Sequence, residues 1–497
     1  MKSAAAASSP ARRRRAALVT PFTLFALLAI VAALGGCAAV GPNYQRPPVT
    51  PPDRMYGQSG PAAAASLADL PWWEIFQDPT LRALIEEALH NGYDVRIAAA
   101  RVEESRARFG IAGSAFDPQI GYQGQAVRER FSKFQTAASS AAGGITADLL
   151  TANVNVSWEI DVWGRVRRLA ESAKAQYLAT EEARRGVTLS LVSEVATAYF
   201  DLRQLDEDLE IARRTTAAFQ DTYDLFNRQL EGGIASALAT SDAEAALAGE
   251  AAQVPALESQ IVAKENQVAR LLGRAPGPIA RGAALGEQAL RPEIPAGLPA
   301  ALLLRRPDLR QAEQQLIAAN ADIGVARAAF FPEISLTGLL GGLSPDLARL
   351  FGQGRTWSLG GGVTGPLFKG GALRGQYRVA VAQWEQARLG YEQAVNNALG
   401  EVSTALLALQ KLAESEKQRE RAVRAYQEAV RLARLRYDSG LSAYFEVVNA
   451  IQQLLGAENA LAQTRHDRLV ALVNFYKALG GGWQVEATAE PPAPASP

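Results

Sequence analysis

The sequence holds few of the side chains that usually carry chemistry. One cysteine and two histidines in 497 residues are too few for a disulfide framework or for Cys/His catalysis. His90 and His466 stand singly in predicted helices, so we interpret them as surface or packing residues and predict no metal site. Gly360, Gly362 and Gly365 form a GxGxxG pattern without the strand-to-helix switch of a dinucleotide site, which indicates a glycine-rich strand and turn. No Walker A lysine, H-E-x-x-H or nucleophile elbow is present, so neither an enzyme nor a bound cofactor is predicted.

The one cysteine, Cys37, has the setting of a modification site. Basic residues 12–15 precede an apolar run at 16–34, the charge order of an export signal, and two glycines then lead to the thiol. This resembles a bacterial lipoprotein signal, in which residues 1–36 are removed and Cys37 carries a covalent N-acyl diacylglycerol. The alternative is a transmembrane anchor, because 19 apolar residues could nearly span a bilayer. In such signals an acid after the cysteine retains the protein at the inner membrane, so Ala38 favours the outer membrane.

Charge and length set only wide bounds on function. Lys plus Arg and Asp plus Glu each number 51, so no net charge draws the chain toward nucleic acid, and no nucleic-acid partner is predicted. A chain of this length could form several domains of ~100 to 200 residues, an expectation that has to be tested against internal repeats.

An internal duplication organises the rest of the chain. Asp94 and Pro118 recur 214 positions later as Asp308 and Pro332, and many residues between them recur with the same offset. Beyond Glu194 the offset is 207, so the first copy holds seven extra residues (214 minus 207), which we expect in a surface loop. The predicted segments are an anchor, linker and equatorial segment at 37–93, the first repeat at 94–273, a linker at 274–307, the second repeat at 308–480 and a tail at 481–497.

Each repeat contains a short β section. Val154, Val156, Trp158 and Ile160 alternate with polar residues, which is the period of a strand with one apolar and one polar face. The same alternation predicts further strands at 119–126, 334–337 and 357–364. Together these strands predict two hairpins. Strands of ~9 to 11 residues with this pattern are typical of a membrane β-barrel, whose lipid-facing side the four apolar residues would form, and a soluble sandwich is the alternative.

Long helices make up most of each repeat. Residues 166–230 and 373–437 lack proline and predict two helices of roughly 100 Å each, with apolar residues in a coiled-coil spacing. The first ends before Gly232 and Gly233 and the second before Ser439 and Gly440. Shorter helices are predicted at 95–115 and 309–329, and return helices at 242–272 and 449–479, the first of them opened by a capping box of Ser241 and Glu244.

The strand count has a consequence for assembly. Four strands cannot close a barrel, and an open sheet edge in lipid leaves unpaired backbone groups that cost several kcal/mol each. Several chains must therefore share one barrel. A cytosolic coiled coil is the alternative for the helices, but an export signal and strand hairpins contradict it.

Several short motifs between Cys37 and about Trp483 suggest a family. They are Gly41-Pro42-Asn43-Tyr44, Trp72-Trp73 with Phe76 and Asp78, Asp161-Val162-Trp163-Gly164-Arg165, Phe330-Phe331-Pro332, Gly370-Gly371, and Arg436-Tyr437-Asp438-Ser439-Gly440. With them the chain resembles the TolC-like outer-membrane factors of tripartite efflux systems of the RND type, in their lipoprotein branch. The resemblance implies an α+β membrane protein. It would be a homotrimer with a transmembrane β-barrel of twelve strands shared between chains, a long coiled-coil α-barrel in the periplasm and a small equatorial region.

The resemblance also implies partners and a gate. A periplasmic adaptor protein would contact the helix tips at Gly232, Gly233, Ser439 and Gly440 and link the channel to an inner-membrane RND-type transporter. In the family, apolar and acidic rings after the second tip narrow the pore. The matching positions are Phe445, Glu446 and Asn449, the last of which departs from the acid that many relatives carry. A ring of Glu446 would select cations. The alternative is a structural role, with Glu446 stabilised by the helix dipole and Phe445 packed between helices.

The resemblance implies a passive exit duct for small molecules such as drugs and toxic compounds, and with it a role in antibiotic resistance. It would be anchored in the lipids of the cell outer membrane and extend into the periplasm. One alternative keeps the duct but assigns it to type I protein secretion or metal efflux, although two methionines and two histidines argue against a soft-metal path. The other is a periplasmic structural or adaptor lipoprotein whose coiled coils only bind partners.

Overall fold

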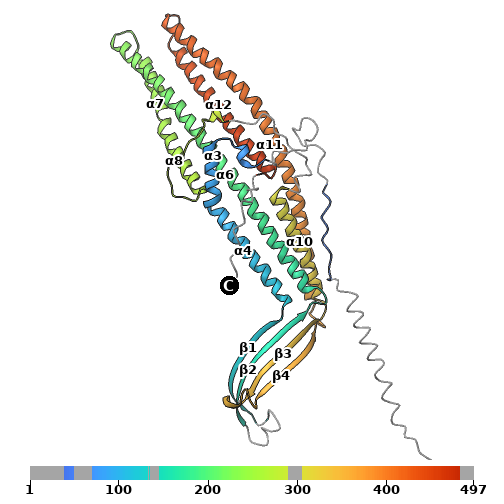
Figure 1. Cartoon of the computed structure of the whole chain (residues 1–497). Coiled ribbons are helices and arrows are strands. Elements are labelled where there is room, and N and C mark those ends of the chain that lie inside the picture. The colour runs from blue at the N-terminus through green and yellow to red at the C-terminus, as the bar shows by residue number, and fades with distance from the viewer. Residues whose placement is uncertain (1–38, 50–69, 133, 135–144, 289–304, 482–497) are drawn as a thin grey trace, which may run out of the picture. The chain divides into compact units, whose positions relative to one another are not determined.

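The computed structural model describes residues 39–49, 70–132, 134, 145–288 and 305–481 (Figure 1). The predicted signal peptide and Cys37 therefore lie outside the described residues. Helices and a four-stranded sheet together confirm the predicted α+β fold. In the described part of the chain, no helix is both long and apolar enough to cross a membrane.

The order of elements in the first half of the chain is repeated in the second half. The first half contains α2 (Trp72–Ile75), α3 (Pro79–Asn91), α4 (Tyr93–Gly113), η2 (Ser114–Phe116), β1 (Gln119–Phe131), β2 (Ile145–Ile160), α6 (Arg165–Glu231), α7 (Ala237–Ala251), α8 (Gln253–Leu271) and η3 (Leu285–Glu287). The second contains α10 (Pro307–Ala328), β3 (Glu333–Ser344), η4 (Leu347–Arg349), β4 (Arg355–Thr364), α11 (Ala372–Asp438) and α12 (Phe445–Ala478). Each half thus gives a helix, a hairpin, a long helix and a return arm, as a duplication requires.

The first return arm differs from its prediction. The prediction that a capping box of Ser241 and Glu244 opens this arm is wrong, because α7 begins at Ala237, five residues earlier than predicted. The residue that caps α7 is Ser236, whose hydroxyl accepts a hydrogen bond from the N–H of Ala239 at 3.2 Å. The arm is also divided between α7 and α8. Pro255 lies in the first turn of α8, where its missing N–H is tolerated, whereas inside one continuous helix it would remove a hydrogen bond.

The described residues fall into two compact units, and each unit takes residues from both repeats. Unit 1 comprises the described residues within 39–45, 106–176 and 316–387, and unit 2 comprises those within 46–105, 177–315 and 388–481. Unit 1 therefore holds all four strands, and unit 2 holds most of the helical residues. This grouping follows from how the repeats pair, since the strands of one repeat hydrogen-bond with those of the other.

The four strands of unit 1 form one antiparallel sheet in the order β1-β2-β3-β4, side by side in Figure 1. The sequence predicted two hairpins. The structure joins them, because residues 150–160 of β2 pair with residues 334–344 of β3. The sheet is therefore continuous across the two repeats.

The main core of unit 2 packs the short helices α2 and α3 against α6, α8 and α12. The ring of Phe76 meets Phe200 edge-on at 6.4 Å and Tyr476 at 6.5 Å between centroids. The Tyr476 hydroxyl donates to the backbone oxygen of Leu70 at 2.7 Å. Trp72 and Phe76, two residues of the family-like motifs, are therefore core residues that hold the N-terminal segment on the helices.

His466 also links elements of unit 2 and is not only a packing residue. Its Nε2 lies 2.6 Å from Asp201 Oδ1 on α6, and its Nδ1 lies 3.0 Å from Asp467 Oδ1. Burial lowers the pKa of His466, but hydrogen bonds to the two carboxylates raise it by more, so that its pKa lies above the ordinary value. The hydrogen bond between His466 and Asp201 thus ties α12 to α6.

Candidate functional site

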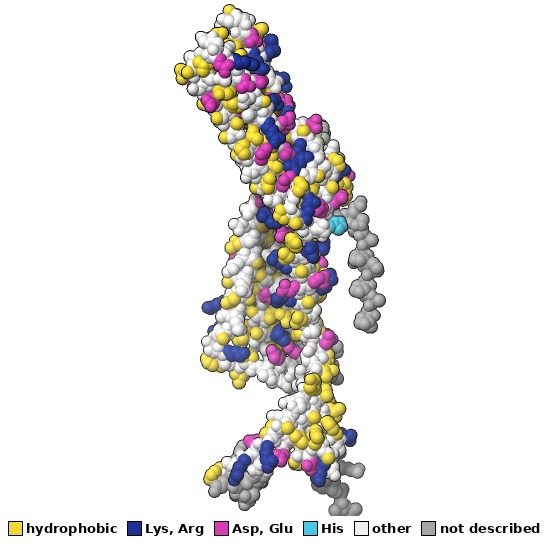
Figure 2. Space-filling view, turned by 90° about the vertical axis from the view of Figure 1, so that its left-hand side faces the viewer, with side chains coloured by type: hydrophobic (Ala, Val, Ile, Leu, Met, Phe, Trp, Pro, Cys, Tyr) yellow, Lys and Arg dark blue, Asp and Glu magenta, His cyan; other side chains and the backbone are white. Residues whose placement is uncertain are grey.

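The sheet has one apolar face and one polar face. The strand register places Val154 between Tyr122 on β1 and Leu340 on β3, and Trp158 beside Leu336. The apolar partners point to the same side because cross-strand neighbours share a face. Val154 is 47% exposed, and hydrophobic side chains gather over part of the strand region in Figure 2. The predicted face of alternate residues on β2 (Val154, Val156, Trp158 and Ile160) is thus apolar across the sheet.

The opposite face carries mostly polar side chains and glycine. Asn153, Asn155 and Ser157 of β2 lie beside Gln123, Gly121 and Gln119 of β1, and beside Gly341, Leu339 and Thr337 of β3. Among the described residues, β1 and β4 each have a neighbouring strand on one side only. The sheet therefore presents an exposed apolar face and two open edges, which a soluble protein would normally cover.

Two helix tips have the same backbone construction. Gly233 after α6 and Gly440 after α11 have φ angles of 73° and 70°, in the left-handed region that favours glycine. In each turn the glycine N–H and the following N–H donate back to the last helical turn, as in a Schellman motif. Exposed apolar side chains lie at these turns: Ile234, Leu238 and Leu441. The predicted adaptor-contact positions therefore lie on exposed turns that offer apolar surface.

The three gate candidates lie in the first turns of α12. Phe445 is 75% exposed, and Glu446 forms an ion pair with Arg436 of α11 at 3.4 Å. Asn449 accepts a long hydrogen bond of 3.5 Å from Gln453 in the next turn. The exposure of Phe445 does not support the alternative that it packs between helices within one chain. The role of all three as a gate stays a prediction.

Sequence reasoning missed the residues that hold this second tip in place. The ring of Tyr444 lies between Tyr437 and Phe226, with centroids 4.7 and 5.0 Å away. Its hydroxyl is 2.7 Å from Thr222 Oγ1 on α6, and Gln229 Nε2 donates to the Tyr437 hydroxyl at 3.1 Å. The two tyrosines on either side of the turn were the available signal. They fix the start of α12 against α6.

We expect substitutions at Phe445 and Glu446 to change ion flow rather than folding. Phe445→Ala should raise single-channel conductance in planar bilayers, and Glu446→Gln should weaken cation preference on the order of twofold, because a ring of carboxylates attracts cations. Glu428→Gln is the matched control, since Glu428 forms a similar exposed pair with Arg431 on α11. Unchanged conductance together with a less stable oligomer would instead indicate a structural role.

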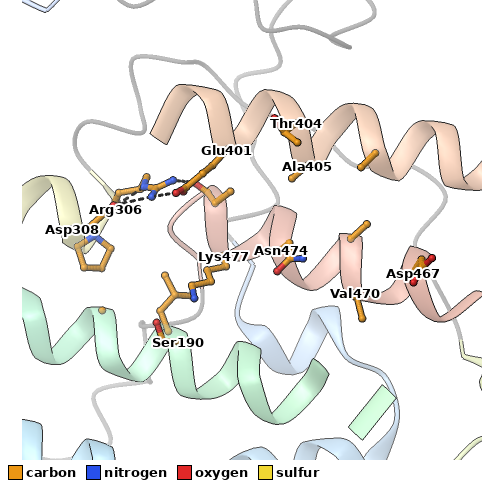
Figure 3. A pocket seen from close by; sticks show the side chains of 16 residues that line it. Ser190, Arg306, Asp308, Glu401, Thr404, Ala405, Asp467, Val470, Asn474 and Lys477 are labelled. Carbon is orange, nitrogen blue, oxygen red and sulfur yellow. Dashed lines mark hydrogen bonds and ion pairs between the residues drawn. The ribbon is translucent and has the colours of Figure 1, made fainter. Parts of the chain in front are cut away.

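A cavity of about 750 Å³ lies in unit 2 between α6, the start of α10, α11 and α12 (Figure 3). Arg306 at its rim donates to Asp308 at 2.8 Å, to Glu401 at 2.7 Å and to the backbone oxygen of Ala478 at 2.9 Å. This guanidinium therefore joins α10 to α11 and to the end of α12. Arg306 falls in the predicted linker at 274–307, so sequence reasoning assigned it no role.

The sequence of the chain matches one protein family over most of its length. The outer membrane efflux protein family matches residues 84–274 and 298–481. The chain belongs to this family. The toluene efflux pump outer membrane protein TtgC of Pseudomonas putida is 35% identical over 470 residues, which cover 93% of this chain and 96% of the relative. The cation efflux system protein CusC of Escherichia coli is 33% identical, with 92% and 98% covered.

The fold of this chain is also similar to that of outer membrane channels with solved structures. The open state of the Neisseria gonorrhoeae MtrE outer membrane channel superposes with a TM-score of 0.80 at 31% identity, covering 90% of this chain and 99% of that one. These likenesses confirm the predicted family, the role as an efflux component and the outer-membrane location. They do not support the alternative of a periplasmic protein that only binds partners.

Proposed function

We propose that three copies of this chain form a passive exit duct of a tripartite efflux pump. The observation that carries the proposal is the sheet, with its exposed apolar face and its open edges on β1 and β4. Pairing β1 of one copy with β4 of the next removes every edge, and three copies contribute twelve strands to one barrel. The apolar face then meets outer-membrane lipid, and the polar face lines the channel.

The helices of unit 2 supply the periplasmic part of the duct. Their exposed tips at Gly233 and Gly440 would contact a periplasmic adaptor protein, which joins the channel to an inner-membrane transporter of the RND type. Such a duct moves cargo without catalysing a reaction, and the transporter supplies the energy. Cys37 would carry the acyl groups that anchor each copy of the protein. Its N-acyl diacylglycerol would supply more than one acyl group, as stable membrane binding requires.

We propose small organic molecules as the cargo, as the name of the toluene pump relative suggests. The relative named as a cation efflux protein favours metal ions as a second candidate. Two methionines and two histidines in the whole chain provide few ligands for soft metals, which favours the first candidate.

Mass measurement of the purified protein in detergent tests the assembly. We expect a species of three chains that migrates differently when heated, because closing the barrel satisfies edges that no single chain can satisfy. In planar bilayers the same preparation should conduct ions. A folded, stable monomer without conductance would contradict both the shared barrel and the duct.

A further inference from the structure

The first described residues of the chain, 39–43, form a strap that lies in unit 1 against the junction of β2 and α6. The Val40 N–H donates to the backbone oxygen of Trp163 at 3.0 Å. From the other side, Asn320 Nδ2 on α10 donates to the backbone oxygen of Pro42 at 2.9 Å, and Asn320 is buried. The strap is thus held by elements from both repeats.

Arg168 on α6 provides most of the polar contacts to the strap. The residue is 4% exposed, and its Nη2 donates to Asn43 Oδ1 at 2.8 Å. Longer bonds of 3.4 and 3.5 Å reach the backbone oxygens of Val40 and Gly41, while Nη1 pairs with Glu171 at 2.7 Å. The planar guanidinium suits this use, because it presents several donors in fixed directions. A lysine could not make the same set of bonds.

Two glycines allow the backbone of the strap to contact the backbone of α10 directly. Gly41 has a φ of 106°, and a Cβ added to it would lie 2.5 Å from the Cα of Gly324 on α10. A Cβ on Gly324 would in turn lie 2.7 Å from Cγ of Arg168. Gly41 and Asn43 belong to one family-like motif of the sequence, and Trp163 to another. The strap thus brings these two motifs together in the fold. Neither the lipid-facing sheet nor the adaptor contact proposed for the helix tips requires this contact.

We propose that this contact is a docking site that fixes the acylated N-terminus beside the β2–α6 junction, with Arg168 as the positioning residue. The proposal rests on the proposed acylation of Cys37. Only Ala38 separates Cys37 from the strap in the sequence, so a lipid on Cys37 would be joined to the strap by a tether of one residue. Lipid attached beside the strap would keep the β2–α6 junction at the membrane surface while the protein copies assemble. A short tether has this effect because it raises the effective concentration of the junction at the membrane.

Thiol labelling of the full-length protein tests the docking. In a Val40→Cys variant, the introduced thiol should react slowly with a maleimide. Adding Arg168→Met should raise the labelling rate about tenfold, since it removes charge-assisted bonds to the strap. Arg184→Met, an exposed arginine on the same helix, is the matched control and should leave the rate unchanged. Equal labelling rates with and without the Arg168→Met substitution would overturn the docking site.

A milder variant covers the case in which Arg168→Met does not fold. Asn43→Ala removes the exposed strap residue that accepts the 2.8 Å hydrogen bond from Arg168 and leaves Arg168 itself unchanged. It should also raise the labelling rate of the Val40→Cys thiol. Labelling unchanged by Asn43→Ala would also overturn the docking site. Acylation is tested separately, because a thioether-linked Cys37 in the parent protein cannot react with maleimide and should incorporate labelled palmitate. A reactive, unlabelled Cys37 would defeat the anchor but not the contact.

A spacer tests the positioning role itself. Six Gly/Ser residues inserted between Ala38 and Ala39 leave Cys37 and the strap intact but lengthen the tether. We expect palmitate incorporation and slow Val40→Cys labelling to persist, whereas conversion to the heat-resistant oligomer should slow severalfold, as with Arg168→Met. Conversion at the parent rate in both variants would overturn the positioning role.

Discussion

Asp78→Ala is expected to destabilise the helical unit by about 3 to 5 kcal/mol, because one buried carboxylate satisfies donors from three parts of the chain. One oxygen caps α3 by accepting from the Thr80 N–H at 2.8 Å. The other accepts from the Tyr199 hydroxyl at 2.7 Å, the Ala283 N–H at 3.1 Å and Gln288 at 2.9 Å. Alanine would lose the cap and leave buried donors unpaired. Thermal or denaturant unfolding of the purified protein measures the loss.

Asp94→Ala is the matched control for this prediction. Asp94 is an exposed acid in the first turn of α4, where its interaction with the helix dipole contributes only ~0.3 to 1 kcal/mol. An effect of Asp78→Ala no larger than that of Asp94→Ala would contradict the proposed role of the buried carboxylate.

The contribution of Asp78 should depend on pH. Burial raises the pKa of its carboxyl, but hydrogen bonds from Gln288, Tyr199 and two backbone N–H groups lower it by more, so the pKa lies below the ordinary 3.8. The stabilisation is therefore fully present above that ordinary value and is lost as the pH falls through the folded-state pKa. The difference in stability between the parent protein and Asp78→Ala should be constant near neutral pH and shrink below about pH 4. A difference that grows on acidification would contradict this assignment.

The long helices are predictable from sequence because their signal is local and repeated over many turns. α6 and α11 extend one residue beyond the predicted 166–230 and 373–437 at each end. The start of α7 is less predictable, since Ser236 and Ser241 both suit a helix cap and the turn after Gly233 decides between them. The alternation along β2 is also a local signal, and it predicts which residues share a face of the strand. The pairing of β2 with β3, which joins the two hairpins into one sheet, cannot be predicted from either strand alone.

Contacts between distant residues lie beyond local patterns. The partners of Asp78 include residues 199, 283 and 288, and Arg306 acts from within a predicted linker. The residue type of Glu446 predicts a charge that would select cations, whereas the structure places Arg436 of the preceding helix beside it. The charge that a ring of Glu446 would offer is therefore smaller than its residue type suggests, which is why the expected change in selectivity is modest.

Val154→Arg is expected to prevent most chains from assembling into the membrane-inserted oligomer. Val154 lies in the middle part of β2 on the apolar face, between Tyr122 and Leu340. A cation at the lipid-facing midplane of a barrel costs on the order of ~2 to 4 kcal/mol, and each of three copies would bear that cost. Trp158 suits this test less well, because its indole N–H donates to the backbone oxygen of Phe116, nearer the helical end of the strand.

Asn155→Arg is the matched control, since the adjacent residue lies on the opposite face, beside Gly121 and Leu339. If that face lines a water-filled channel, the arginine stays hydrated and assembly should remain near the parent level. The heat-resistant oligomer recovered from outer membranes measures both variants. Equal losses would show that neither face meets lipid, as in a soluble sandwich. A greater loss for Asn155→Arg would reverse the two faces, because only the lipid side penalises a charge.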